Sequence, residues 1–192
     1  MEIVRDFDSF YELIEHFDSE ETCKDHLEKV RWNGNPVCPH CGHEHVYVLN
    51  LTGQTNKYWK CADCRKKFTV TVGTIFHNSK ISLRKWFIAI YLITSHKKGI
   101  SSHQLARDLK VTQKTAWFIL HRVREAFTPN KAEVFSNEVE IDETFIGGKE
   151  KNKHKSKRTA NTQGRSTKTK VPVLGILERN GKVYALPVVN TK

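Results

Sequence analysis

Two short stretches decide the fold: CPHC at residues 38–41 and, after nineteen intervening residues, CADC at residues 61–64. Four thiolates at this paired spacing can close a tetrahedral shell around one zinc ion and leave no open position for chemistry. Three short runs typical of strands accompany them, at 45–49, 58–60 and 68–72. The sequence therefore predicts a zinc ribbon over residues 36–76, with a structural zinc ion held by Cys38, Cys41, Cys61 and Cys64. The core of such a unit is small, so metal binding supplies much of its folding free energy.

Other metal-binding side chains lie near these cysteines. Because four thiols already satisfy the ion, we interpret the neighbouring histidines as exposed or phosphate-facing: His40, His43, His45 and His77. The fifth cysteine, Cys23, shares a helical stripe with Leu27 and Val30. That position indicates a buried apolar thiol and not a ligand.

Charge is unevenly distributed along the chain, which carries +11 overall. Residues 1–30 hold three Lys/Arg against ten Asp/Glu, a balance of −7, whereas residues 31–130 hold sixteen against four, a balance of +12. Residues 131–192 hold thirteen against seven, a balance of +6. A basic middle behind an acidic front indicates that the middle binds a polyanion such as duplex DNA, because Lys and Arg release the counterions condensed on phosphates.

An acidic membrane surface is the competing partner for so basic a chain. The longest strongly apolar run, residues 86–93, is far shorter than the ~20 residues that span a bilayer, so we expect no membrane partner. The start of the chain is acidic and lacks the basic region and apolar core of a secretory signal. We therefore expect a cytoplasmic, nucleoid-associated protein.

Helical periodicity fills the two segments beside the predicted ribbon. Residues 1–35 read as an acidic helical segment with helices at 8–16 and 19–31. Residues 77–130 read as three helices, at 82–96, 103–110 and from 113 to about 127. The last two are joined by so short a turn that a DNA-binding helix-turn-helix is predicted.

The third of these helices separates into two faces on a helical wheel. An inward face comprises Ala116, Ile119, Leu120, Val123 and Phe127. The residues predicted to contact DNA lie on the outward face and in the first turn, where a recognition helix reaches base edges: Gln113, Lys114, Phe118, His121 and Arg122. An ordinary solvated helix with one stray aromatic is the alternative.

A different pattern begins at residue 137. Residues 138–146 alternate like a strand, with Val139, Ile141 and Phe145 on one face and Glu140 and Asp142 on the other. Gly147 and Gly148 stop this strand. A mobile basic loop of nine Lys/Arg and one Glu is expected over 149–170. Two more strands follow at 171–177 and 183–189, joined by a tight turn at Asn180-Gly181. The spacing alone does not decide the role of Asp142, which is either a cation ligand or part of a solvated sheet face.

Three strings carry a resemblance to a known family: RWNGNPVCPHCGH at 31–43, GTIFHNSKISLRKWF at 73–87 and EIDETFIGGKEKNKHKSKR at 140–158. Together with the order of the segments, they resemble the zinc-ribbon, DDE-type insertion-sequence transposases related to the eukaryotic Merlin transposons. The likeness extends over essentially the whole chain.

The resemblance implies a fold and an activity. The implied fold is multidomain α+β: a small helical N-terminus with a zinc ribbon, a helix-turn-helix, and the first strands of an RNase H-like α/β domain at 137–192. In that family Asp142 corresponds to the first acidic ligand of two Mg²⁺ or Mn²⁺ ions, which serve hydrolytic nicking at element ends and strand transfer into target DNA. The implied partners are the terminal repeats, target DNA and further copies of the chain on DNA.

An RNase H-like site needs further acidic residues from a later strand and a late helix. We therefore expect a C-terminally truncated domain that does not catalyse transposition alone. Two other functions fit parts of the sequence. A zinc-ribbon and helix-turn-helix regulator would bind element ends without catalysis. A ribbon-bearing structural subunit of transcription machinery fits the cysteines but not the DETFIGGK string at 142–149.

Overall fold

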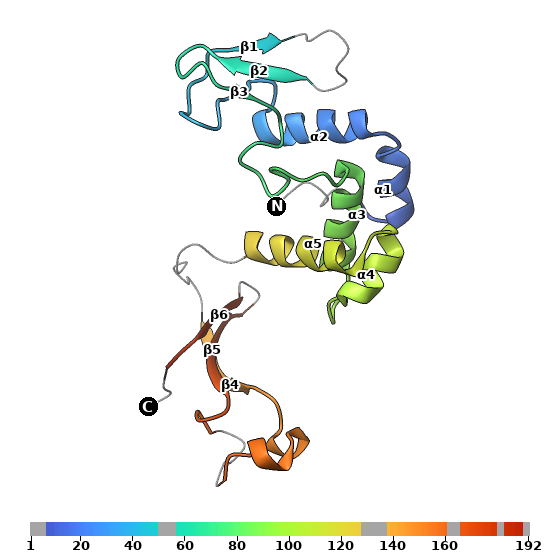
Figure 1. The fold of residues 1–192 in the computed structure, drawn as a ribbon. Helices are drawn as coiled ribbons and strands as arrows, with labels where there is room; N and C mark the ends of the chain where they lie inside the picture. Colours follow the sequence, from blue (N-terminus) through green and yellow to red (C-terminus); the bar gives the residue numbers. More distant parts are fainter. Residues whose placement is uncertain (1–6, 50–56, 128–137, 161–165, 180–182, 190–192) are drawn as a thin grey trace. The chain divides into compact units, whose positions relative to one another are not determined.

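A computed structural model of the chain describes residues 7–49, 57–127, 138–160, 166–179 and 183–189. The chain divides into two compact units, Met1–Thr128 and Pro129–Lys192, which are described separately (Figure 1). Helices and two small antiparallel sheets alternate along it, which confirms the predicted mixture of helix and sheet.

The first unit opens with two helices, α1 (Phe10–His16) and α2 (Glu20–Trp32). The Ser19 hydroxyl accepts the Thr22 N–H and the Thr22 hydroxyl accepts the Ser19 N–H, so a reciprocal capping box begins α2. Asn33, with φ 45°, ends α2 in the left-handed conformation. Both helices fall within two residues of their predicted bounds.

The ribbon sheet has the order β1 (Val46–Leu49), β2 (Tyr58–Cys61) and β3 (Lys67–Phe68), all antiparallel. The strand expected over 68–72 is wrong beyond Phe68. The chain turns there because the Thr71 carbonyl accepts both the N–H and the hydroxyl of Thr74, at 3.2 and 2.7 Å. Threonine hydroxyls compete with a sheet ladder for backbone groups in this way.

Aromatic rings join α2 to the ribbon. Trp59 and Phe68 are buried and stack with their centroids 6.0 Å apart, and Trp32 meets Trp59 edge-on at 4.9 Å. The Arg31 guanidinium donates to the Val70 carbonyl at 2.6 Å. The helix that precedes the ribbon therefore supplies much of its apolar core.

Three helices complete the first unit: α3 (Leu83–Ser95), α4 (Ser102–Leu109) and α5 (Gln113–Ala126). Each begins at a capping hydroxyl that accepts a backbone N–H of its first turn, from Ser82, Ser101 and Thr112 respectively. Lys110, with φ 49°, turns the chain between α4 and α5. No helix among the described residues is long and apolar enough to cross a membrane.

Buried side chains from these three helices form one core: Leu83, Trp86, Phe87, Ala89, Ile90, Leu105, Leu109, Ala116, Ile119, Leu120 and Val123. Four of the five residues predicted to face inward on α5 belong to it. Phe127 does not, and that prediction is wrong: it follows the last residue of α5 and remains 49% exposed.

The segment at 69–82 connects the ribbon to α3. Phe76 is buried against Trp86 and Phe87, with ring centroids 5.5 and 5.8 Å away. The Trp86 indole donates to the Ser79 hydroxyl at 3.0 Å, and Arg122 of α5 donates to the His77 carbonyl at 2.9 Å. This connector is thus bonded to the helices on which it packs.

The second unit is a sheet of order β4 (Val139–Ile146), β5 (Val171–Glu178) and β6 (Val183–Pro187), again antiparallel. Its cross-strand register confirms the predicted alternation. The row of Asp142, Gly175 and Ala185 lies on one face, and the row of Ile141, Ile176 and Tyr184 lies on the other. The predicted Asn180-Gly181 turn falls outside the described residues.

The basic segment after β4, expected to be a mobile loop, contains local structure in its described parts, and its mobility stays a prediction. Two single 3₁₀ turns, Glu150–Asn152 and Lys155–Lys157, shape it. The Glu150 carboxylate accepts the Lys153 ammonium and the Thr159 N–H, and these hydrogen bonds, that of Lys153 first, lower the pKa of Glu150. One acidic residue thereby organises a strongly basic stretch.

Gly147 and Gly148 offer a matched test of the packing after β4. A Cβ at Gly147 would lie 2.8 Å from Cγ of Lys170 and 3.0 Å from the Thr169 carbonyl, whereas one at Gly148 would meet nothing within 4 Å. Gly147→Ala should therefore destabilise the second unit by about 1–3 kcal/mol through overpacking, and Gly148→Ala by well under that. Urea unfolding followed by hydrogen exchange of residues 138–179 measures the free energy of unfolding of both variants. Equal losses of stability would contradict the close approach at Gly147.

Candidate zinc site and nucleic-acid interface

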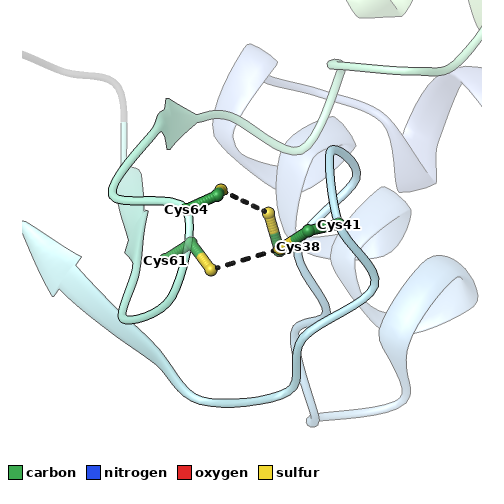
Figure 2. Close-up of side chains that lie close together, drawn as sticks. All are labelled: Cys38, Cys41, Cys61 and Cys64. Carbon is green, nitrogen blue, oxygen red and sulfur yellow. Dashed lines mark hydrogen bonds between the residues drawn. The ribbon is translucent and has the colours of Figure 1, made fainter.

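Four cysteine sulfurs converge where the ribbon's two loops meet (Figure 2). Cys38 and Cys41 precede β1, Cys61 ends β2, and Cys64 follows in the turn toward β3. The Sγ atoms of Cys38 and Cys64 are 3.7 Å apart, and those of Cys41 and Cys61 are 3.6 Å apart. All four sulfurs lie within 4.8 Å of one another.

Two similar backbone turns position these thiols. In the first, the Cys38 N–H donates to the His43 carbonyl and the Gly42 N–H donates to the Cys38 carbonyl, both at 2.9 Å. Gly42 has φ 76°, a conformation that glycine adopts without a steric penalty. In the second, the Cys61 N–H donates to the Lys66 carbonyl at 3.1 Å, and Arg65 takes the left-handed conformation with φ 58°.

The distances fit one tetrahedral metal ion. A Zn–S bond of about 2.3 Å places the sulfurs of a regular tetrahedron about 3.8 Å apart. The observed 3.6 and 3.7 Å are close to that edge. A disulfide needs about 2.05 Å between sulfurs. The cluster can therefore hold zinc and is not a pair of disulfides.

The thiols influence one another's protonation. Burial raises the pKa of Cys38, but hydrogen bonds from the backbone of His40 and Cys41 and from neighbouring thiols outweigh it and lower the pKa to about 7. For Cys41, the His43 N–H lowers the pKa, whereas burial and the other thiols raise it, to about 12. Four thiolates at this spacing need a cation, so metal binding releases protons here.

The other cysteine and the histidines near the ribbon do not belong to this cluster. Within the described ranges, the four cysteines are the only group of three or more metal-binding side chains, so His40, His43, His45 and His77 belong to none. Cys23 is fully buried on α2, as predicted, and burial raises the pKa of its thiol to about 12. Cys23 is therefore a small apolar residue of the core and not a metal ligand.

Four of the five residues predicted to contact DNA are exposed on α5: Gln113, Lys114, Phe118 and His121. Gln113 also donates from its amide to the Ser102 hydroxyl of α4, at 2.9 Å. The amide is therefore held in place at the start of the helix.

Phe118 and Arg122 also contact other parts of the unit. Phe118 remains 42% exposed, but its ring meets Trp86 edge-on at 6.2 Å. The Arg122 guanidinium lies 5.2 Å from the Phe118 ring centroid while it donates to the His77 carbonyl. Both side chains thus have structural partners, and their contact with DNA stays a prediction.

Trp117 is the residue that sequence reasoning missed. It is 52% exposed, and its ring centroid lies 4.1 Å from that of His121. It sits one turn after Gln113 and one turn before His121, so a helical wheel that included it would have placed it on the same strip.

Asp142 is exposed at the middle of β4, where its Oδ1 accepts the Glu143 N–H at 2.8 Å. The neighbouring Glu140 is engaged elsewhere, because Arg179 binds it at 3.0 Å and binds Glu138 at 2.8 Å. Across the sheet from Asp142 lie only Gly175 and Ala185, which leave its carboxylate unobstructed on that face.

Comparisons with known proteins agree with these features. Residues 18–67 match the transposase zinc-ribbon domain of the IS1595 type, and residues 134–192 match the ISXO2-like transposase domain. An uncharacterized protein in transposable element ISH50 of Halobacterium salinarum is 30% identical over 181 residues. That alignment covers 91% of this chain and 60% of the relative. No solved structure matches the chain.

A four-cysteine ribbon followed on one chain by a transposase domain defines a class, the zinc-ribbon transposases of insertion sequences. The chain belongs to the IS1595 family of that class. The family indicated by the sequence motifs is thereby confirmed. The matched ribbon begins at residue 18 and so includes α2, in keeping with the contact between Trp32 and Trp59.

Zinc content offers a direct test of the cluster. Purified protein should contain one zinc ion per chain, and Cys61→Ser should lose it, because three thiols leave the tetrahedron open. Cys23→Ala is the matched control: it removes a buried thiol that is not among the four clustered cysteines, and it should keep the zinc. Elemental analysis decides between them. Zinc-free wild-type protein, or a Cys61→Ser variant with full occupancy, would show that the cluster is not the metal site.

Proposed function

We propose that this chain recognises the ends of an insertion sequence and that the complete protein cuts and joins DNA there with divalent metal ions. The observation that carries the proposal is that one chain of the IS1595 family combines a helix, α5, whose first turn is polar and exposed, with a sheet that presents Asp142. The binding step and the chemical step rest on different residues, so each has its own test.

DNA recognition is assigned to α4 and α5 as a helix-turn-helix. Three features support this assignment: the two helices pack on each other through a short turn, the start of α5 is exposed, and Lys114 stands in its first turns. A recognition helix presents its N-terminal residues to base edges in the major groove. Gln113 and Lys114 occupy that position here.

A structural zinc ion is assigned to Cys38, Cys41, Cys61 and Cys64. Its role is to hold the two loops of the ribbon together, because the sheet between them buries little beyond Trp59 and Phe68. The ribbon then adds phosphate contacts through its basic residues, as does the basic segment after β4.

Catalysis is assigned to Asp142 in an RNase H-like domain. The carboxylate would hold one of two Mg²⁺ or Mn²⁺ ions, which supply activation of the attacking oxygen and stabilisation of the leaving oxygen. Oxygen ligands suit these ions, and the Gly175 and Ala185 row leaves room beside the carboxylate. Within the described residues Asp142 joins no cluster of three potential ligands, so the complete site draws on other parts of the protein.

A DNA-binding regulator without catalysis is the second candidate. In the described residues Asp142 belongs to no group of three or more potential metal ligands, which favours this candidate. Such a protein would occupy the terminal repeats through the same ribbon and α5, and it would compete with a complete transposase for them.

Lys114 and Arg122 separate a DNA contact from a structural contact. Lys114→Ala should leave the melting temperature unchanged, weaken binding to all duplexes alike and reduce the salt slope by about one unit. Arg122→Ala should lower stability by about 1–3 kcal/mol, because it removes the hydrogen bond to the His77 carbonyl. Fluorescence anisotropy across a salt series, paired with thermal unfolding, measures both, and unchanged DNA affinity in Lys114→Ala would reject α5 as the recognition helix.

Asp142 and Glu140 are a matched pair on one strand. In the complete transposase, Asp142→Asn should abolish Mg²⁺-dependent cleavage while terminal-repeat binding stays nearly intact, because the metal ligand acts only in the chemical step. Glu140→Gln should keep cleavage, since its partner is Arg179. Gel assays of cleavage and of binding on the same duplex separate the two steps. Normal cleavage by Asp142→Asn would show that Asp142 is part of a solvated sheet face and not a metal ligand.

A further inference from the structure

Trp117 has a large apolar surface that packing does not use. The core side of α5 is supplied by Ala116, Ile119, Leu120 and Val123. The adjacent aromatic, Phe118, packs toward Trp86. Half of Trp117 faces outward, and among the described rings its partner is His121, at 4.1 Å.

The position of Trp117 is that of a base-reading side chain. It is the fifth residue of α5, one turn beyond Gln113 and on the same strip as His121. Polar groups thus stand on either side of the indole along the helix. A helix that lies in the major groove with its first two turns against the bases brings this strip to the base edges.

The chemistry of the groove then selects the ligand. In the major groove the base edges offer hydrogen-bond donors, acceptors and one apolar group, the C5-methyl of thymine. An indole face pressed against donors and acceptors leaves them unsatisfied, which costs free energy. Against thymine methyl groups the same face buries apolar surface on both sides.

We propose that Trp117, with the tilted His121 ring packed against it, reads thymine methyl groups in the terminal repeat. The contact with the imidazole limits the rotamers of the indole, so less side-chain entropy is lost on binding. This assignment rests on the proposed role of α5 as a recognition helix and adds to it the base that the helix prefers.

Replacing thymine by uracil removes only the methyl group and so tests the proposal directly. The probes are two fluorescein-labelled duplexes of the terminal repeat of the element that encodes the chain, one with dT and one with dU throughout. The wild-type chain should bind the dU duplex about three- to fivefold more weakly for each contacted methyl group, the effect expected from burying one such group. Trp117→Ala should weaken binding of the dT duplex and bind both duplexes equally.

Tyr11→Ala is the control for removing an exposed aromatic side chain, since Tyr11 is 70% exposed on the acidic helix α1. It should keep the preference for dT. Thermal unfolding should show all three proteins equally folded, because neither side chain belongs to the core.

The outcomes distinguish the inference from the function on which it rests. If the wild-type chain binds neither duplex, the proposed DNA recognition fails, and the inference fails with it. If it binds both equally, or if Trp117→Ala still prefers dT, DNA recognition stands and the thymine assignment is overturned. A Trp117→Ala variant that changes the sedimentation coefficient but keeps the dT preference would instead make the strip a protein contact and overturn the proposal.

Discussion

The closure of four cysteine side chains around one point is the constraint on which the first unit depends. The sulfurs bring the loop before β1 against the turn after β2, with Sγ separations of 3.6 and 3.7 Å. Only then do Trp59 and Phe68 form a surface that Trp32 of α2 can cover. Arg31 on the same helix binds the Val70 carbonyl as the chain leaves the ribbon. A metal ion in this cluster would therefore stabilise α2 and the connector as well as the ribbon itself.

Local signals in the sequence predicted the helices of the first unit, because helical periodicity depends on neighbours a few residues away. They could not predict what covers each flank of α5. A helical wheel gives Phe118 and Arg122 an outward direction, but the His77 carbonyl, 45 residues from Arg122 along the chain, binds that side chain. The connector thus gives Arg122, on one flank of α5, a partner within the unit, whereas Trp117 stays 52% exposed. Long-range contacts of this kind decide which aromatic is available to a ligand.

The second unit shows the same division between local and long-range information. Alternation placed Asp142 and Ile141 on opposite faces, which the register confirms, because the side-chain period of a strand is fixed at two. The partners of the carboxylates could not be read from that pattern. Arg179 binds Glu138 and Glu140 only because β5 runs antiparallel to β4 in this register, and Asp142 meets Gly175 for the same reason. The register thus singles out one carboxylate on this face of β4 that is not ion-paired in the described structure.

The charge on the ribbon sheet supports the same interpretation as the exposed strip of α5. Lys60 and Lys67 lie directly opposite each other on β2 and β3, with Tyr47 beside them on β1. Like charges in directly opposed positions destabilise a sheet, since no bond compensates their repulsion. A phosphate backbone along this row would remove the repulsion and release its own counterions. On the acidic helix α2, Glu28 instead forms an ion pair with Lys57 at 2.7 Å. Glu20 accepts the Leu83 N–H at the start of α3, at 2.9 Å. Glu20 and Glu28, which would repel DNA, are thus bonded within the unit. A polyanion bound along the lysine row would stabilise the sheet that presents it.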